Sequence, residues 1–254
     1  MPDKISPAIC PLTVAEIQSI FVHTCDNFQF SNVQTAQLPT ILEKMSKRIE
    51  HTLLKLNTSP TQIQQLCTEA MEFGFRGVCC LPRYVKTCAS ILQHTDIITV
   101  SVVDFPLCGA VSEDVKTLAK SVVADGADEI DMVLDVPSLK TGDLRPVFDR
   151  IAMVADAIRP VPLKVILETA WLTESEIVTA CAICAVAGAA FVKTSTGFAD
   201  RGASVRDIEI IKAAVGETLR IKASGGIKDA TFARQLVAAG ADVIGTSAGP
   251  ACIH

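Results

Sequence analysis

The chain has 254 residues, of which 49% are hydrophobic and only 5% aromatic. This composition indicates a core of Val, Ile, Leu and Ala, which is typical of a parallel sheet covered by helices. The net charge of −5 and the lack of a basic segment argue against nucleic acid as a partner.

The sequence shows no sign of export or membrane insertion. Residues 1–7 lack the apolar region of a signal peptide, and no run of about 18 apolar residues occurs. Most of the ten cysteines lie in apolar runs such as Val78–Leu81 and Ala180–Ala185, as buried thiols of a reduced protein do. We therefore expect a cytoplasmic protein without a membrane partner.

Neither the histidines nor the cysteines suggest a metal. The four histidines are scattered and show no metal-ligand spacing. Cys181 and Cys184 have the spacing of a redox pair, but they lie in an Ala-rich helical pattern without a second pair. We expect no metal and no other cofactor.

The chain divides into an extension and a repeating part. Residues 1–45 are polar with two amphipathic segments, which predicts an N-terminal helical extension. Residues 46–254 alternate between apolar segments and segments of helical period, which predicts an α/β domain, a (β/α)8 TIM barrel. The predicted strands are Arg48–Leu53, Arg76–Leu81, Ile97–Val103, Glu129–Leu134, Leu163–Leu167, Ala190–Thr194, Leu219–Ala223 and Val243–Gly245. The predicted helices are Thr61–Phe73, Tyr84–Gln93, Val111–Asp125, Leu144–Ile158, Thr173–Gly188, Ser204–Val215 and Ala230–Gly240.

The eighth strand–helix unit is incomplete. After Gly249 only residues 250–254 remain, which are too few for a helix. Either the natural C-terminus is missing or the N-terminal extension covers the gap, and the sequence leaves both open.

Two lysines stand at the ends of neighbouring predicted strands. Lys193 follows Phe191 and Val192, and Lys222 follows Ile221, so both are expected to be buried. Active groups of this barrel project from the carboxyl ends of strands, where the two amines would face one cavity. Each ammonium disfavours protonation of the other, and burial acts in the same direction. One of them is therefore expected to be a free amine that forms a Schiff base with a carbonyl.

Carboxylates at other strand ends allow two interpretations. Asp131 is placed to move protons for a Schiff-base reaction. Alternatively, each lysine belongs to a structural ion network, a role for which Lys164 is the better candidate because Glu168 and other acids follow it.

Glycine-rich turns after the last two strands predict a phosphate site. Ser224-Gly225-Gly226 follows the seventh strand, and Gly245–Gly249 follows the eighth. The loops after these strands form the phosphate site of many such barrels, where bare backbone amides bind an oxyanion. A phosphorylated substrate is therefore expected.

These motifs resemble those of the deoxyribose-phosphate aldolases. The resemblance extends from about residue 49 to residue 249. It implies reversible cleavage of 2-deoxy-D-ribose 5-phosphate to D-glyceraldehyde 3-phosphate and acetaldehyde, without a metal, in a homodimer or homotetramer. The matching motifs are Val78–Arg83, Glu129–Val133, Lys164–Thr169, Lys193–Phe198, Lys222–Ile227 and Ile244–Ser247.

The resemblance also implies roles for individual residues. Lys193 would form the Schiff base, Lys222 would depress its pKa, and Asp131 would move protons with a bound water. Glu50 would have an orienting role. The residues expected to bind substrate are Thr52, Cys79, Lys164, Thr194, Ser224, Gly225, Gly226 and Ser247.

The chain departs from the family pattern at three places. Glu50 stands where the family usually has Asp, Cys108 lengthens a loop, and the eighth helix is missing. These departures motivate a second hypothesis, a weak or inactive barrel that acts as a binding or regulatory protein through its N-terminal extension. A third hypothesis is another phosphosugar enzyme of the same fold, such as a Schiff-base transaldolase.

Overall fold

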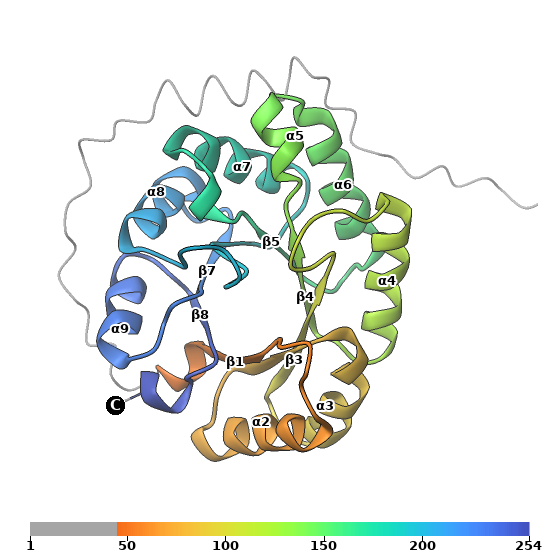
Figure 1. Cartoon of the computed structure of the whole chain (residues 1–254), viewed down its shortest axis with the longest axis vertical. Coiled ribbons are helices and arrows are strands. Elements are labelled where there is room, and N and C mark those ends of the chain that lie inside the picture. The colour runs from red at the N-terminus through yellow and green to blue at the C-terminus, as the bar shows by residue number, and fades with distance from the viewer. Residues whose placement is uncertain (1–44, 254) are drawn as a thin grey trace, which may run out of the picture.

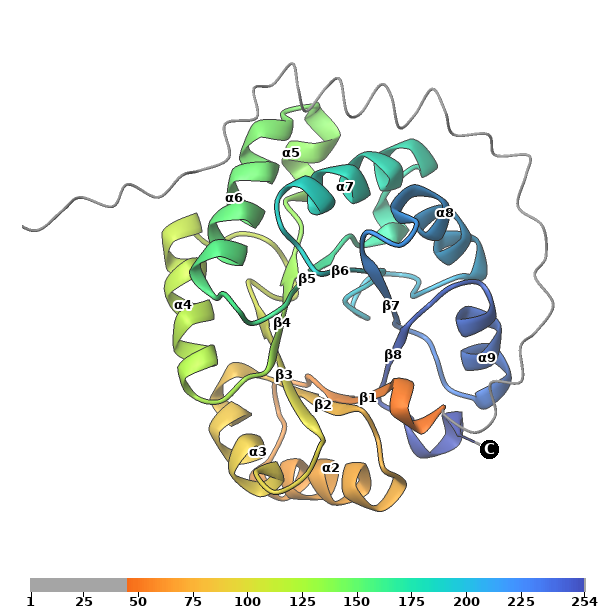
Figure 2. The ribbon, with the colours of Figure 1, turned by 180° about the vertical axis from the view of Figure 1, so that it is seen from behind.

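The computed structural model describes residues 45–253, in which eight parallel strands close into a barrel. Each strand pairs with the next in chain order, and the last pairs with the first. The strands form the centre and the helices surround them (Figures 1 and 2). The predicted (β/α)8 barrel is confirmed. The strands are β1 (Ile49–Leu53), β2 (Gly77–Cys80), β3 (Ile98–Val103), β4 (Glu129–Val133), β5 (Leu163–Ile166), β6 (Phe191–Lys193), β7 (Arg220–Ser224) and β8 (Val243–Thr246).

Each of the seven helices predicted for residues 46–254 is present within a few residues of its expected bounds. Local signals explain several of the ends: Ser59 caps the first helix in a capping box with Gln62, and Gly74 ends that helix in a left-handed conformation. The predicted helices are α2 (Pro60–Phe73), α3 (Val85–Leu92), α4 (Ser112–Ala124), α6 (Leu144–Ala157), α7 (Glu174–Val186), α8 (Val205–Val215) and α9 (Ala230–Ala238).

One helix was not predicted. The short helix α5 (Val136–Thr141) follows β4, and Asp135 caps it by accepting a hydrogen bond from the Ser138 amide at 3.1 Å. Asp135, four residues after Asp131, therefore serves as a helix cap.

The end of the barrel agrees with the expectation of an incomplete eighth unit. Within residues 45–253, β8 is followed by a 3₁₀ turn, η6 (Pro250–Cys252), rather than an α-helix. Another 3₁₀ turn, η3 (Ser46–Arg48), lies beside it in both views (Figures 1 and 2). Most of the predicted N-terminal extension lies outside the described residues, so the division into two domains stays a prediction. No helix within residues 45–253 is long and apolar enough to cross a membrane.

The two faces of the strands have different surroundings. Outward-facing residues such as Ile130 and Val192 are fully buried in the apolar layer between barrel and helices. Their neighbours Asp131 and Lys193 point to the interior because successive side chains of a strand alternate. Parallel register then pairs Asp131 with Lys164, and Lys193 with Lys222, on adjacent strands. The fold therefore concentrates charged groups at one place inside the barrel.

Phe75 tests the apolar layer. Its side chain is 0% exposed and stacks on Phe73 at 5.7 Å between ring centroids, so Phe75→Ala leaves a large cavity. We expect a loss of about 3–5 kcal/mol in the free energy of unfolding, measured by urea denaturation. The control Met71→Ala, on the exposed side of α2, is expected to change that free energy by less than about 1 kcal/mol. Equal effects of the two substitutions would contradict the description of this layer.

Candidate active site

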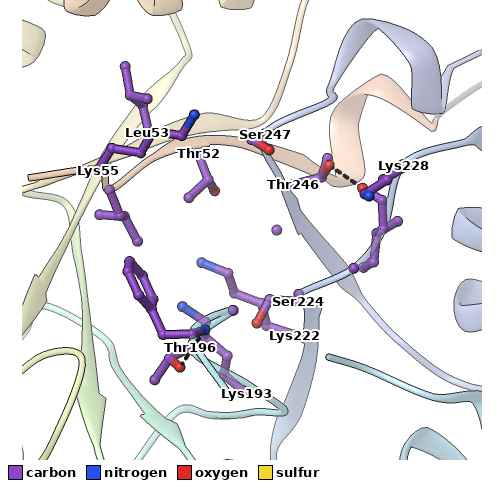
Figure 3. Close-up of a pocket in the computed structure, with 17 residues that line it drawn as sticks. Thr52, Leu53, Lys55, Lys193, Thr196, Lys222, Ser224, Lys228, Thr246 and Ser247 are labelled. Atoms are coloured by element: carbon purple, nitrogen blue, oxygen red, sulfur yellow. Dashed lines mark hydrogen bonds between the residues drawn. The ribbon is translucent and has the colours of Figure 1, made fainter. Parts of the chain in front are cut away.

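A cavity of about 320 Å³ opens at the carboxyl ends of β1, β6, β7 and β8. In Figure 3, Lys193 and Lys222 extend into it, while Thr52 and Ser247 lie on the opposite side. Seven residues that the sequence assigned to the site line this cavity. They are Thr52, Lys193, Lys222, Ser224, Gly225, Gly226 and Ser247.

The two lysines share one carboxylate oxygen. Asp131 Oδ2 lies 2.8 Å from Lys193 Nζ and 2.7 Å from Lys222 Nζ. All three side chains are almost completely buried. The lysines come from adjacent strands at paired positions, and Asp131 reaches them across the barrel from β4. The sequence-based expectation that these residues meet at one place agrees with this geometry.

Further charged side chains form ion pairs with Asp131 and Lys222. Lys164 Nζ lies 2.9 Å from the other oxygen of Asp131 and 2.7 Å from Glu129 Oε2. Glu50 pairs with Lys222 through one oxygen and with Arg76 through the other. Glu50 is therefore in contact with the lysine that it was expected to orient.

Lys164 belongs to an ion network, as the second interpretation expected, but Glu168 is not one of its partners. Glu168 Oε2 accepts a hydrogen bond from the Thr196 hydroxyl and another from the Thr196 amide at 3.2 Å. Its backbone takes a positive φ of 54° two residues after the end of β5, which turns the side chain out of the strand alternation. Glu168 therefore holds the loop that follows β6.

The environments of the two cavity lysines shift their pKa values in opposite directions. Burial lowers the pKa of Lys193, and the ammonium of Lys222 acts in the same direction against the attraction of Asp131. Burial also acts to lower the pKa of Lys222, but Asp131 and Glu50 outweigh it and raise that pKa. Lys193 is thus the more readily deprotonated amine, while Lys222 keeps its charge.

The carboxylate and Lys164 remain ionised. Burial acts to raise the pKa of Asp131, yet the ammonium groups of Lys164, Lys193 and Lys222 hold it well below its usual range. Lys164 has a raised pKa because Asp131 and Glu50 outweigh the effect of its burial. The amine of Lys193 therefore has a charged carboxylate as its neighbour.

Three residues predicted to bind substrate do not line the cavity. Lys164 is fully buried in the charged group, and Cys79 is a fully buried thiol whose pKa is raised by burial. Thr194 links two loops, because its hydroxyl donates to Ser224 O at 3.1 Å and accepts from Ser224 N at 3.0 Å. Their assignment to substrate binding stays a prediction.

The sequence reasoning missed an aromatic wall near Lys193. Phe105 and Phe198 meet edge to face with ring centroids 5.5 Å apart, and Lys193 Nζ lies 5.9 Å from the Phe105 centroid. Asp104 holds the loop that carries Phe105, because it accepts from Ala110 N at 3.0 Å and pairs with Arg150. The wall keeps one end of the cavity apolar. In the sequence, the one sign of this wall was Phe198, the aromatic residue that follows Gly197.

Glycine turns and the cationic side chain of Lys228 lie at the opposite end of the cavity. Gly225 and Gly226 have positive φ values of 85° and 74°, which leave their amides uncovered by side chains. Lys228 also lines the cavity and was missed, although it lies two residues after Gly226. Gly202 packs against this turn so closely that a Cβ there would lie 2.1 Å from Gly225 O.

Within residues 45–253, no three His, Cys, Asp or Glu side chains group as metal ligands. The side chains that meet at the site are amines and a carboxylate. An amine of lowered pKa in a barrel cavity, beside a charged carboxylate, is an arrangement through which the lysine of an enzyme can react with a carbonyl compound.

Comparison with known proteins shows the family to which the chain belongs. The model of the DeoC/LacD family aldolases matches residues 40–252, and the chain belongs to this family. It is therefore an aldolase, a lyase. Similar proteins named deoxyribose-phosphate aldolase include those of Brevibacillus brevis (45% identity over 205 residues) and Thermoanaerobacter sp. (45% over 209 residues). Each alignment covers 81% of this chain and 93% of the relative.

Solved structures agree. A crystal structure assigned to a deoxyribose-phosphate aldolase of Coccidioides immitis superposes with a TM-score of 0.91 at 34% identity. It covers 96% of this chain and 97% of the other. A deoxyribose phosphate aldolase of Aeropyrum pernix, described as tetrameric, has a TM-score of 0.77 over 95% of this chain and 97% of the other. Its 24% identity shows the shared fold alone.

The opposite pKa shifts make the two cavity lysines chemically distinguishable. Brief reductive methylation with formaldehyde and cyanoborohydride near pH 8 is expected to modify Lys193 about tenfold faster than Lys222, because more of it is free amine. Peptide mass spectrometry measures both rates on the same sample. The denatured chain is the control and should show equal rates. Equal rates in the folded protein would contradict the pKa assignment.

Proposed function

We propose that this aldolase reversibly cleaves 2-deoxy-D-ribose 5-phosphate into D-glyceraldehyde 3-phosphate and acetaldehyde. The observation that carries the proposal is the amine of Lys193, whose pKa is lowered at a cavity that it shares with the charged Lys222 and a glycine-rich turn. The names of the similar proteins support the choice of substrate.

In this mechanism Lys193 is the nucleophile. Its free amine adds to the C1 aldehyde, and loss of water gives a protonated Schiff base. Removal of the C3 hydroxyl proton then breaks the C2–C3 bond, and the bonding electrons move into the C1–C2 enamine. Glyceraldehyde 3-phosphate leaves, C2 is protonated, and hydrolysis releases acetaldehyde and regenerates Lys193.

Asp131 and Lys222 serve this sequence in different ways. Asp131 Oδ2 lies 2.8 Å from Lys193 Nζ, so the carboxylate is placed to move protons to and from the reacting nitrogen and carbons, directly or through water. Lys222 stays charged and disfavours protonation of Lys193. Lys164 pairs with Asp131, and Glu50 pairs with Lys222. These contacts orient the two groups.

The two ends of the cavity orient the substrate. The turn at Gly225 and Gly226, with Lys228 and Ser247, binds the phosphate through amides, a hydroxyl and a cation. The apolar wall at Phe105 lies nearer Lys193 and suits the two-carbon aldehyde end. Thr52 lies between the ends and binds a substrate hydroxyl.

We further propose a cytoplasmic homodimer or homotetramer. The family relationship supports this, and the Aeropyrum pernix relative is itself described as tetrameric. Light scattering of the purified chain measures the assembly. The non-catalytic alternative and the transaldolase alternative are separated from the proposal by a coupled retro-aldol assay with different phosphosugars.

Trapping the intermediate tests the nucleophile. Borohydride with acetaldehyde is expected to add a stable two-carbon mass to Lys193, because reduction fixes the Schiff base. Lys193→Ala should lose the adduct and at least about 10³-fold of kcat. No adduct, or an adduct at another lysine, would overturn the assignment.

Replacing Lys222 tests its electrostatic role. Without the Lys222 cation, the pKa of Lys193 rises, so the acidic limb of kcat/KM moves to higher pH in Lys222→Met. The sign follows because only unprotonated Lys193 reacts. The matched control Lys228→Met, in the same cavity, should raise KM and leave that limb in place. Coincident limbs for wild type and Lys222→Met would contradict the role.

Gly202 tests the phosphate end. A Cβ at position 202 would meet Gly225 O at 2.1 Å, so Gly202→Ala must displace the turn. We expect about a tenfold rise in KM for the phosphorylated sugar, and little change in kcat/KM for unphosphorylated 2-deoxyribose. Gly109→Ala, whose Cβ meets no atom within 4 Å, is the control. Equal losses for both sugars would refute a phosphate site at this turn.

A further inference from the structure

Beneath Lys193 the buried charges form a closed ring. Three cations and three carboxylates alternate, and each side chain forms an ion pair with the next. Four of the six pairs measure 2.6, 2.7, 2.7 and 2.9 Å. The remaining two are the contacts that Glu50 makes with its neighbours. In order, the members are Arg76, Glu50, Lys222, Asp131, Lys164 and Glu129.

The formal charges of the ring cancel. Arg76 is the most exposed member, with 18% of its side chain accessible, and Glu129 follows with 8%. The other four are 1% exposed or less. Charges removed from water to this degree are tolerated only when they are paired, so the balance is a requirement of the fold.

Lys193 lies outside this balance. It contacts the ring at one point, Oδ2 of Asp131, and this carboxylate already pairs with Lys222 through Oδ2 and with Lys164 through Oδ1. A protonated Lys193 would therefore add a fourth cation to three carboxylates, whereas a neutral Lys193 leaves the site uncharged. The titratable groups that face Lys193 are Asp131 from β4, Lys222 from β7 and the thiol of Cys79 from β2.

Two members of the ring cannot touch a substrate. Arg76 immediately precedes β2, and Glu129 is the first residue of β4, so both lie toward the amino ends of their strands. Neither lines the cavity. Arg76 Nη2 binds Glu129 Oε1 at 2.6 Å, and this pair joins the two halves of the ring. Any effect of the pair on Lys193 passes through Glu50 and Lys164.

Glu50 makes this connection possible. Its two carboxylate oxygens bind different partners, Lys222 on one side and Arg76 on the other. The residue that the sequence marked as a departure from its family is therefore the bridge between the catalytic lysine pair and Arg76.

We propose that Arg76 and Glu129 are positioning residues that close the ring and thereby set the protonation of Lys193. This inference rests on the proposed function, in which the free amine of Lys193 is the nucleophile. The ring balances its own three cations with its own three carboxylates, so a protonated Lys193 would be one cation in excess, and the neutral amine is favoured.

The two single substitutions are expected to shift the pH dependence in opposite directions, and the double substitution is expected to restore it. Arg76→Gln removes a cation, leaves one carboxylate in excess and favours protonated Lys193. The acidic limb of kcat/KM should move up by about one pH unit. Glu129→Gln removes a carboxylate and should move the limb down by about as much. Arg76→Gln/Glu129→Gln restores the balance and should return the limb near that of wild type.

Controls separate charge from packing. Arg76→Lys keeps the charge but not the bidentate contact, and should keep the limb near that of wild type. Arg145→Gln and Asp149→Asn break an exposed ion pair on α6 and should leave the limb unchanged. Thermal unfolding of each variant confirms that the chain is folded.

Each possible outcome either supports or overturns the proposed ring. Opposite shifts that cancel in the double variant support the ring. Shifts in the same direction, no shifts, or a double variant that keeps either shift would overturn it. Borohydride trapping on wild type is run in parallel: absence of a Lys193 adduct there rejects the proposed function, whereas a normal adduct with unshifted limbs rejects the ring alone.

Discussion

The structure depends on one carboxylate that three ammonium groups share. Asp131 contacts Lys164, Lys193 and Lys222 in a place that water does not reach. At 2.8 Å and an effective dielectric constant of about 20, one such pair contributes about 6 kcal/mol, which is similar to the cost of burying an ion. An unpaired charge in this buried group would be costly, so the group is most stable near electrical neutrality. That constraint acts together with burial to favour the free amine of Lys193, whose pKa is lowered.

The surroundings of this charged group give the cavity a direction. On one side Phe105 and Phe198 form an apolar wall against Lys193, and Asp104 holds the loop that carries Phe105. On the other side the turn at Gly225 exposes backbone amides, and the close packing of Gly202 keeps the turn in place. A substrate with a carbonyl at one end and an anion at the other fits such a cavity in one orientation. The loops that follow the barrel strands thus position the two ends of the cavity around the reacting amine.

Much of the fold and part of the site could be predicted. The alternation of apolar segments with segments of helical period located all eight strands, because this pattern depends on local backbone geometry. Helix α5 was missed since six residues are too few to show helical periodicity. The ion network around Lys164 was expected, but Glu168 is not part of it, because Glu168 follows the strand with a positive φ and alternation no longer applies there. The contacts of Arg76 with Glu50 and Glu129 were missed because local pattern does not show which side chains meet across the barrel.

Local sequence is enough to specify the successive strands, the two lysine motifs and the resemblance to an aldolase family, since these follow from residues that are close together along the chain. Which charges meet depends on how the chain folds. Glu50 and Lys222 are neighbours in space because β1 closes the barrel against β8, and closure brings together residues that lie at opposite ends of the sequence. The different pKa values of Lys193 and Lys222 depend on charged partners that are distant in the sequence. No local segment of the sequence shows these partners together.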